Sequence, residues 1–399
     1  MRDLRVLHIG KFFPPHAGGI ERYSADLCGA LAARGVATAM LAHAPPGTHR
    51  TQRYLVDRVE VTLAACHGQL LYAPISPSFP WLLARLIADF KPDLLHIQAP
   101  NTSAFWALLL GSARHLPWLL QWQSDVPLDV AKPMLRAAAR LYRPWENALL
   151  RRANVVVASS AEYRDSSQTL APWLPKTKVI PLGLPELAGS APTGKSIQWP
   201  ASGLRLLAVG RLSYYKGFDV LLRALAQLAQ VSLVLIGSGE CEKQLKTLAE
   251  ELGLAARVRF AGHVDDATLA ATYASAEAFC LPSVERTEAF GMVLLEAMRA
   301  RLPVVASAVP GSGVGYVVGA DVGGLLVPPG NADKLAEALR RLVDVPALRA
   351  RLGYAGHARW QTEFSLDRCA DRTLTLYRSM LEPNAPRATA SRVESPPPE

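Results

Sequence analysis

The sequence predicts an α/β protein built from two doubly wound domains. Three observations predict this fold class: the chain has 399 residues, short apolar strands alternate with helix-length stretches, and the alternation starts again after a stretch without periodicity. A chain of this length exceeds one ordinary hydrophobic core, so two domains of roughly 200 residues each are expected. Strands separated by helices pair in parallel through right-handed crossovers, which gives a doubly wound sheet in each domain.

The first half, residues 1–185, opens with an apolar strand at 4–9 and a helix from Ile20 to Arg34. Its later strands are expected at 36–42, 59–65, 93–97, 117–122 and 154–158. We expect no signal peptide, because no charged leader precedes a long apolar core. No apolar run approaches the roughly 18 residues of a membrane span.

Residues 186–203 are rich in Gly, Ser, Pro and Thr and are expected to form a linker. The second domain, 204–364, then repeats the pattern of the first. Its expected elements are strands at 204–209, 231–236, 258–260 and 278–283, helices at 218–230, 291–300 and 331–343, and a helix from Pro346. Residues 383–399 lack apolar periodicity and are expected to be disordered.

The positive charge of the chain is concentrated in its first half. The net charge is +9, and residues 1–199 carry 21 Lys and Arg against 13 Asp and Glu, a surplus of 8. The densest basic segment is 132–152, where Arg136, Arg140 and Arg143 form one helical stripe and Leu141, Trp145 and Leu149 form another. Either this is an ordinary surface helix packed by its Leu/Trp stripe, or the Arg stripe also contacts an anionic membrane. Pro144 is expected to break or restart this helix.

The cysteine content argues against a disulfide framework and against a zinc site. The five Cys are scattered, odd in number and without a C-x2-C pair. A reducing cytoplasmic environment fits this pattern.

A loop between a strand and a helix organises the second half. The strand that ends near Pro282 is followed by a loop with Glu288-Ala289-Phe290 and then, from Gly291 to Ala300, by good helix formers. The start of a helix exposes unpaired backbone N–H groups, which suit an anion. Glu288 and Glu296 flank this point, and a ligand that carries both phosphates and hydroxyls would use both features. The alternative is that Glu288 caps the helix and Glu296 is a solvated side chain.

Three motifs together resemble the family-4 (group 1) glycosyltransferases, retaining enzymes of the GT-B fold. They are the two glutamates eight residues apart with Phe290-Gly291 between them, Gly210-Arg211-Leu212-x3-Lys216-Gly217, and Gly18-Gly19-Ile20-x-Arg22 before the first long helix. The resemblance covers about residues 4–381. It implies two Rossmann-like domains facing across a cleft, with a last helix at 365–381 that completes the first, acceptor-side domain.

The resemblance also implies roles for individual residues. Arg211 and Lys216 would neutralise the leaving diphosphate, since the chain has no Asp-x-Asp motif to hold a metal ion. Glu288, with the backbone of Ala289, Phe290 and Gly291, would hold the transferred sugar. The remaining contacts to the nucleotide would come from Gly18, Gly19, Met292, Val293, Glu296, Gly237 and Val264. No cofactor and no metal ion are expected, and retention is ascribed in this family to same-face attack.

One position departs from the related pattern. Gln121-Trp122-Gln123-Ser124-Asp125 resembles a Trp-His-Ser-Asp segment whose His lies near the sugar, and Gln123 stands where that His would be. An amide donates and accepts hydrogen bonds but does not titrate near neutrality. Gln123 can therefore replace the His if that residue only hydrogen-bonds the sugar. Activity should be low if the residue at this position must carry charge.

This subgroup pattern resembles bacterial mannosyl- or rhamnosyltransferases of O-antigen and capsule assembly. The resemblance implies a transferase that moves a hexose, of mannose or rhamnose type, from a GDP- or UDP-sugar to a lipid-linked or growing cell-surface saccharide. The expected place is the cytoplasmic face of the plasma membrane, contacted through 132–152. A donor-binding scaffold with weakened activity is the alternative, and a same-fold epimerase is disfavoured by the paired motifs. No nucleic-acid recognition motif accompanies the basic charge, so nucleic acid is not an expected partner.

Overall fold

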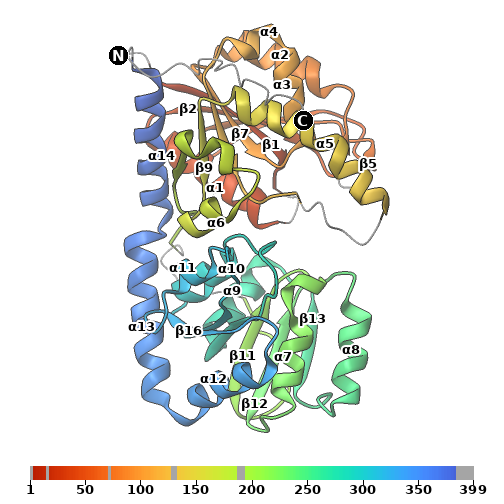
Figure 1. Ribbon diagram of the computed structural model, residues 1–399, viewed down its shortest axis with the longest axis vertical. Helices are drawn as coiled ribbons and strands as arrows, with labels where there is room; N and C mark the ends of the chain where they lie inside the picture. Colours follow the sequence, from red (N-terminus) through yellow and green to blue (C-terminus); the bar gives the residue numbers. More distant parts are fainter. Residues whose placement is uncertain (1–2, 15–17, 71–72, 127–132, 187–193, 383–399) are drawn as a thin grey trace, which may run out of the picture. The chain divides into compact units, whose positions relative to one another are not determined.

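The computed structural model describes residues 3–14, 18–70, 73–126, 133–186 and 194–382. Its contacts divide into two compact units, each built around its own sheet (Figure 1). Unit 1 consists of Met1–Ala158, Pro172–Lys178 and Ala370–Glu399, and unit 2 of Ser159–Ala171 and Val179–Cys369. The predicted tail, 383–399, and part of the predicted linker lie outside the described residues.

Unit 1 has an eight-stranded sheet in the order β10-β9-β8-β7-β1-β2-β4-β3. The strands from β9 to β4 pair in parallel, and β3 pairs with β4 in antiparallel fashion at one edge. The bounds are β1 Arg5–Phe12, β2 Ala37–His43, β3 Gln52–Val56, β4 Val59–Ala64, β7 Leu94–Ala99, β8 Trp118–Trp122, β9 Val155–Ala158 and β10 Thr177–Val179. A separate hairpin joins β5 Gly68–Leu70 to β6 Ala73–Ile75.

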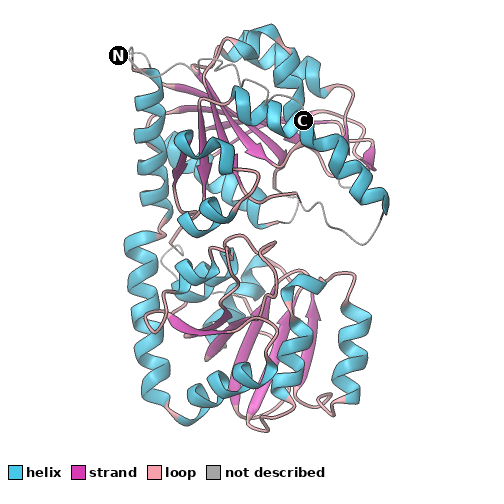
Figure 2. Ribbon diagram, viewed as in Figure 1, coloured by secondary structure: helices cyan, strands magenta, loops and turns pink. Residues whose placement is uncertain are grey.

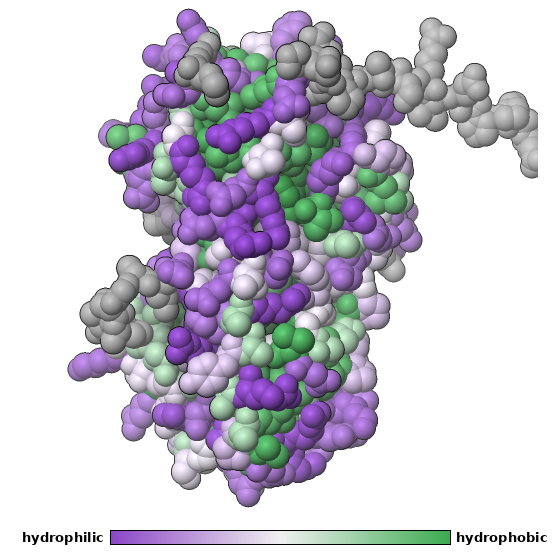
Figure 3. Space-filling model, turned by 90° about the vertical axis from the view of Figure 1, so that its left-hand side faces the viewer, coloured by the Kyte–Doolittle hydropathy of each residue, from purple (hydrophilic) through white to green (hydrophobic). Residues whose placement is uncertain are grey.

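Helices cover this sheet, as Figure 2 shows. They are α1 Gly19–Ala33, α2 Phe79–Phe90, α3 Phe105–Leu109, α4 Gly111–Arg114, α5 Pro133–Arg152 and the part of α14 Leu366–Leu381 from Ala370 onward, with short 3-10 turns at Thr102–Ala104 and Ala171–Lys176. On the face drawn in Figure 3, hydrophilic side chains are interspersed with smaller hydrophobic patches.

Unit 2 has a six-stranded sheet in the order β13-β12-β11-β14-β15-β16, with every pair parallel. The strands are β11 Leu204–Val209, β12 Val231–Ile236, β13 Val258–Gly262, β14 Ala278–Leu281, β15 Val304–Ser307 and β16 Gly324–Val327. The helices are α6 Ala161–Ser166, α7 Phe218–Leu225, α8 Glu242–Glu251, α9 Asp266–Ser275, α10 Met292–Arg299, α11 Val314–Val318, α12 Ala332–Asp344 and α13 Pro346–Glu363, with a 3-10 turn at Tyr214–Lys216.

The central strands of unit 2 are buried along their whole length, because helices cover both faces of a parallel sheet. Their side chains pack with those of α7, α8 and α12 into one continuous core. The carboxyl ends of the strands are the edge from which loops carry functional side chains in such a sheet.

The α6 segment has its contacts in unit 2, although the predicted boundary assigned it to the first domain. The guanidinium of Arg286 stacks on the Tyr163 ring at 4.4 Å and donates to Ser166 Oγ at 3.1 Å. Ser166 Oγ in turn donates to the carbonyl of Gly311 at 3.0 Å. These contacts explain why Ser159–Ala171 groups with unit 2.

Two predictions about α5 are wrong. The helix runs unbroken through Pro144, so the missing N–H of that residue does not end it. Leu141 and Trp145, predicted to pack inward with Leu149, are 75% and 43% exposed. The buried stripe consists of Ala139, Glu146, Leu149 and Leu150. Tyr142 is half-buried, with its hydroxyl fully enclosed.

Helix α7 ends at Leu225, earlier than predicted, and the strand predicted at 278–283 ends at Leu281. The edge strands β3 and β16 were not predicted. The five cysteines are free thiols. None of the helices among the described residues is long and apolar enough to cross a membrane.

Candidate functional site

The loop between β14 and α10 buries the carboxylate of Glu288. Glu288 Oε2 accepts a hydrogen bond from Ser283 Oγ at 3.1 Å and lies 2.5 Å from Lys216 Nζ. Ser312 Oγ donates to the backbone oxygen of Glu288. In the part of the chain that the structure describes, the other carboxylate oxygen, Oε1, has no hydrogen bond. Glu288 is therefore held rigidly with one oxygen still available.

Lys216 and Glu288 form a buried ion pair, with each side chain only 10% exposed. Burial by itself lowers the pKa of Lys216, but Glu288, Tyr215 and Glu296 together outweigh it and hold this pKa above the ordinary value. The ammonium group is therefore charged at neutral pH. An ion pair of this kind costs desolvation and is weak evidence for stability, so it suggests a role beyond folding.

Close approach of two loops explains why a glycine follows Lys216. Gly217 has φ +65°, and a Cβ there would lie 2.1 Å from the carbonyl oxygen of Pro282. Val284 N donates to the carbonyl of Tyr215 at 2.8 Å, which joins the same two loops. The Lys216-Gly217 step thus brings the end of β11 against the end of β14, where Glu288 follows.

Arg211 follows the carboxyl end of β11 and is 57% exposed. Its guanidinium pairs with Glu240 at 3.3 Å, in the loop after β12. Lys216 Nζ lies 3.4 Å from the position of a Cβ on the neighbouring Gly210. Both predicted cations therefore belong to the loop after the same strand, one buried and one exposed.

The start of α10 has no side-chain cap. Its N-cap is Gly291, in the left-handed conformation with φ +81°, and a Cβ there would lie 2.8 Å from Leu294 Cδ1. The capping alternative for Glu288 is therefore wrong. The backbone N–H groups of Met292 and Val293 belong to the first turn of α10, where helix geometry leaves them without intrahelical partners.

Ala289 and Phe290 are buried and fix the loop that precedes α10. Ala289 O accepts from Gly313 N at 2.8 Å. Phe290 packs edge-on against Phe364, with ring centroids 6.0 Å apart.

Glu296 is partly buried on α10 and is not a fully solvated side chain. Tyr273 Oη, from α9, donates to Glu296 Oε2 at 2.8 Å. Burial first, and Glu296 second, raise the pKa of Tyr273 well above its ordinary value, so the hydroxyl stays protonated and acts as a donor. The carboxylate of Glu296 is thus oriented by a fixed partner.

Gly237 and Val264 follow the neighbouring strands β12 and β13. A Cβ on Gly237 would lie 2.0 Å from the carbonyl oxygen of Gly210, so no side chain fits there. Gly237 N donates to the carbonyl of Gly262 at 2.8 Å. These residues share the carboxyl edge of the unit 2 sheet with Arg211 and Lys216.

Three predicted site residues belong to unit 1. Gly18 precedes α1 in an extended conformation, and Gly19 is the first residue of that helix. Gln123 follows β8, is buried, and donates from Nε2 to Gln98 Oε1 at 2.7 Å. His16, beside the two glycines, lies outside the described residues.

Several residues that support the site were not predicted as site residues from the sequence. Ser283, Ser312 and Tyr273 contact Glu288 or Glu296, and Arg286 braces the loop that carries Glu288. Ser312 stands in Gly311-Ser312-Gly313 after β15, a strand-end signal that could have pointed to it. Tyr273 lies inside a helix and gave no such signal.

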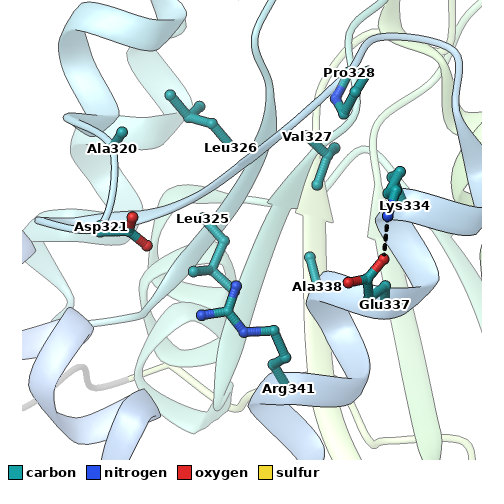
Figure 4. Close-up of a pocket in the computed structure, with 10 residues that line it drawn as sticks. All are labelled: Ala320, Asp321, Leu325, Leu326, Val327, Pro328, Lys334, Glu337, Ala338 and Arg341. Carbon is teal, nitrogen blue, oxygen red and sulfur yellow. Dashed lines mark hydrogen bonds and ion pairs between the residues drawn. The ribbon is translucent and has the colours of Figure 1, made fainter.

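A surface pocket on unit 2 contains none of these residues. It is lined by Ala320, Asp321, Leu325, Leu326, Val327, Pro328, Lys334, Glu337, Ala338 and Arg341, beside β16 and α12 (Figure 4). Lys334 and Glu337 pair within it at 2.7 Å and are both exposed. The strand-end geometry, rather than this pocket, defines the candidate site.

Among the described residues, no group of three or more His, Cys, Asp and Glu could hold a metal ion.

Both halves of the chain match family models. Residues 195–359 match the glycosyl transferases group 1 model, and residues 18–183 match the glycosyl transferase 4-like domain.

Full-length relatives agree with these matches. The chain is 28% identical to O-antigen chain mannosyltransferase C of Escherichia coli over 383 residues, which covers 95% of this chain and 99% of that one. It is 29% identical to the D-rhamnosyltransferase WbpZ of Pseudomonas aeruginosa, covering 91% and 92%. It is 30% identical to the phosphatidyl-myo-inositol mannosyltransferase of Mycobacterium leprae, covering 85% and 87%.

Solved structures show the same fold. Sucrose-phosphate synthase from Thermosynechococcus elongatus superposes with a TM-score of 0.78 at 26% identity, covering 94% of this chain and 99% of that one. Anabaena Alr3699/HepE in complex with UDP gives a TM-score of 0.69 at 23% identity, covering 94% and 100%. The chain is therefore a glycosyltransferase of the GT-B fold, and it belongs to the group 1 glycosyltransferases, family 4.

Proposed function

We propose that this glycosyltransferase transfers a hexose from a nucleotide diphospho-sugar to a lipid-linked or growing cell-surface saccharide, with retention of the anomeric configuration. The observation that carries the proposal is the buried pair of Lys216 and Glu288 beside the uncapped start of α10. A fixed cation and free backbone N–H groups suit a diphosphate, and a fixed carboxylate suits sugar hydroxyls.

Arg211, Lys216 and the first turn of α10 are the proposed diphosphate site. Negative charge builds on the leaving diphosphate as its bond to the sugar breaks. Two cations and the N–H groups of Met292 and Val293 stabilise that charge without any reorganisation of the protein. The proposed diphosphate site uses no metal ion and no other cofactor.

Glu288 is the proposed contact of the transferred sugar, together with the backbone of Ala289, Phe290 and Gly291. Its Oε2 is occupied by Lys216 and Ser283, which leaves Oε1 to accept from a sugar hydroxyl.

The remaining contacts would hold the nucleotide. Glu296, held by Tyr273, would accept from the ribose hydroxyls. Gly237 and Val264 would border the base, and Gly18 and Gly19 would approach the diphosphate with backbone amides.

Gln123 is the proposed group of unit 1 that hydrogen-bonds the sugar. The attacking hydroxyl of the acceptor approaches from the face that the diphosphate leaves, and its proton passes to the leaving phosphate. This course requires no carboxylate nucleophile, and Gln123 needs only to bind and orient.

The sugar type and the acceptor are inferred from relatives. Relatives named for O-antigen mannosyl transfer and for D-rhamnosyl transfer favour a hexose of the mannose or rhamnose type and a role in lipopolysaccharide assembly. A GDP-sugar is therefore the first donor to test, with a UDP-sugar as the second.

A thermal-shift panel tests the proposal. GDP-mannose, UDP-glucose and ADP-glucose are added separately, and the midpoint of unfolding is followed against concentration. A donor that binds only the folded state stabilises it by about 2.7 kcal/mol at 100 times its Kd. Stabilisation by one nucleotide sugar, and its loss in Glu288→Gln, is expected, whereas no response to any nucleotide sugar would overturn the proposal.

A donor-binding scaffold is the second candidate, favoured by the amide at position 123. Release of nucleoside diphosphate in the presence of a bacterial membrane-lipid extract separates the two. Turnover supports the enzyme, and tight donor binding without turnover, even after Gln123→His, supports the scaffold.

The acceptor side is proposed to meet the inner face of the plasma membrane through α5. Met134, Leu141 and Trp145 form one exposed apolar stripe on this helix, and Arg136 and Arg140 are exposed on another side of it. Helix α3, which contacts α5, exposes Trp106 and Leu109, and α2, which contacts α3, exposes Trp81. Apolar and basic side chains together suit the surface of an anionic bilayer.

Vesicle co-sedimentation tests this contact. Arg136→Glu with Arg140→Glu is expected to reduce binding to vesicles that contain anionic lipid, by about 1 kcal/mol or more per reversed charge. Lys243→Glu with Arg259→Glu, two exposed cations of unit 2, is the charge-matched control and should bind as the unchanged protein does. Equal loss in both double variants would show that net charge, and not α5, governs binding.

A further inference from the structure

On one face of the unit 1 sheet, strands β1, β7 and β8 and the residue after β8 carry five buried polar side chains, where parallel strands normally carry apolar ones. Parallel register pairs His8 of β1 with His96 of β7, and Gln98 of β7 with Gln121 of β8. Paired residues of parallel strands share a face, and side chains alternate along each strand, so these four and Gln123 lie on the same face. None of the five is more than 6% exposed.

Four residues form a continuous hydrogen-bonded chain that ends at Gln123. Tyr377 Oη, on α14, lies 2.5 Å from His96 Nδ1. His96 Nε2 lies 3.4 Å from Gln98 Nε2. Gln98 Oε1 accepts from Gln123 Nε2 at 2.7 Å. The C-terminal helix of unit 1 is thereby connected to the proposed sugar-binding amide.

The chain has a direction. Burial first, and His8 second, hold the pKa of His96 well below its ordinary value, so its ring is neutral and has one donor and one acceptor nitrogen. An amide nitrogen only donates, so His96 Nε2 accepts from Gln98 and His96 Nδ1 donates to Tyr377. The carboxamide oxygen of Gln98 therefore faces Gln123, and the carboxamide nitrogen of Gln123 must point toward Gln98 to donate to it. The carboxamide oxygen of Gln123 is left on the side away from Gln98.

This polar row costs stability. Among the described residues, both ring nitrogens of His8 and the Nε2 of Gln121 are buried without a hydrogen-bond partner. Burial lowers the pKa of His8 to about 3, which keeps that ring neutral as well. Unpaired buried polar groups are costly, and an apolar face would avoid the cost. Orientation of a functional side chain is a role for which such a network is retained.

We propose that Gln98 is a positioning residue, which holds the carboxamide of Gln123 with its oxygen toward the sugar, and that His96 and Tyr377 hold Gln98 in turn. Gln123 is then a fixed hydrogen-bond acceptor for a sugar hydroxyl, and its orientation is set from within the sheet. The inference rests on the proposed contact between Gln123 and the sugar, and it adds the residues that determine which end of the amide makes that contact.

The test uses the full chain and the nucleotide sugar selected by the thermal-shift panel, with the matching nucleoside diphosphate as a second ligand. In Gln98→Leu, kcat/KM for nucleoside diphosphate release is expected to fall about 10-fold, the effect of one lost hydrogen bond in a buried site. Binding of the nucleoside diphosphate, which lacks the sugar, should not change. Gln121→Leu is the matched control, since it changes the same residue type on the same face without a bond to Gln123.

A double-mutant cycle separates positioning from a general structural effect. If Gln98 acts through Gln123, Gln98→Leu lowers kcat/KM when Gln123 is present. In a protein that already carries Gln123→Ala, adding Gln98→Leu should lower kcat/KM no further. Equal losses in both backgrounds, or a similar loss in Gln121→Leu, would overturn the inference.

Two further outcomes are distinguishable. If Gln123→Ala itself leaves activity unchanged while the nucleotide sugar still binds, the proposed role of Gln123 fails and the inference fails with it, but the donor site of unit 2 stands.

If Gln98→Leu does not fold, the same cycle is run with Tyr377→Phe, which keeps the aromatic ring and removes the hydroxyl that accepts from His96. Additivity between Tyr377→Phe and Gln123→Ala would then refute the inference, and non-additivity would support it.

Discussion

Glu146 is the only acid in the basic segment 132–152, and it is buried on the inner face of α5. Its Oε2 pairs with Arg143 Nη1 at 3.1 Å, and its Oε1 is buried without a partner among the described residues. Burial, with a smaller contribution from Asp125 and against the opposing charge of Arg143, raises the pKa of Glu146 to about 7. Tyr142, one turn earlier on α5, is the other titratable group that it faces.

A raised carboxyl pKa makes stability fall as the pH rises. Below the ordinary pKa of 4.5, Glu146 is protonated in both the folded and the unfolded protein. Between pH 4.5 and about 7 it ionises in the unfolded protein but stays protonated in the folded one, so the unfolded state is increasingly favoured as the pH rises. Glu146→Gln removes this penalty, so its stability relative to the unchanged protein should improve by up to about 3 kcal/mol between pH 4.5 and pH 8. Urea unfolding at both values measures it, with the exposed Glu162→Gln as control. A pH-independent difference would show that the pKa of Glu146 is the same in the folded and unfolded states.

At the scale of elements, the close contact of the β11 and β14 loops depends on Gly217. In Gly217→Ala the new methyl group would clash with the Pro282 carbonyl, and the residue would also be held at a positive φ. In Gly253→Ala the residue would be held at a similar φ, +68°, but its methyl group would have open space around it. We expect Gly253→Ala to cost about 1 kcal/mol and Gly217→Ala about 2–3 kcal/mol. Only Gly217→Ala should weaken donor binding, because it displaces Lys216. Thermal unfolding with and without the nucleotide sugar measures both effects, and equal donor affinity in the two variants would contradict the proposed site.

Strands and helices were predictable where one local signal dominated. The runs at 204–209 and 231–236 are confirmed residue for residue, because central parallel strands are predominantly apolar. The packing of α5 was not predictable, since its sequence offers two apolar stripes. The contacts of its neighbours bury Glu146 and Leu149, while Leu141 and Trp145 stay exposed. The edge strands β3 and β16 are short or exposed and carry a weaker pattern.

At the scale of the whole molecule, the sequence predicted the two sheets and the family, and the structure supports both. The candidate site was predictable from motifs at strand ends, since Lys216 and Glu288 are 72 residues apart and still form an ion pair. The partners that hold these residues were not predictable. Tyr273 and Ser312 reach the site from inside a helix and from a separate loop, and only tertiary structure brings them there. In unit 1, only tertiary structure brings Gln98 to Gln123.

The central claim is that cations after β11 stabilise the departing diphosphate, and Arg211 tests it most directly because it is exposed and not needed for packing. Arg205, at the amino end of the same strand, pairs with Glu277 at 3.2 Å as Arg211 pairs with Glu240 at 3.3 Å, and is the matched control. The measurement is kcat for nucleoside diphosphate release from the selected nucleotide sugar in Arg211→Met and Arg205→Met. The account predicts a fall of about 100- to 1,000-fold in Arg211→Met, with unchanged thermal stability, and little change in Arg205→Met. Equal turnover in the two variants would contradict it.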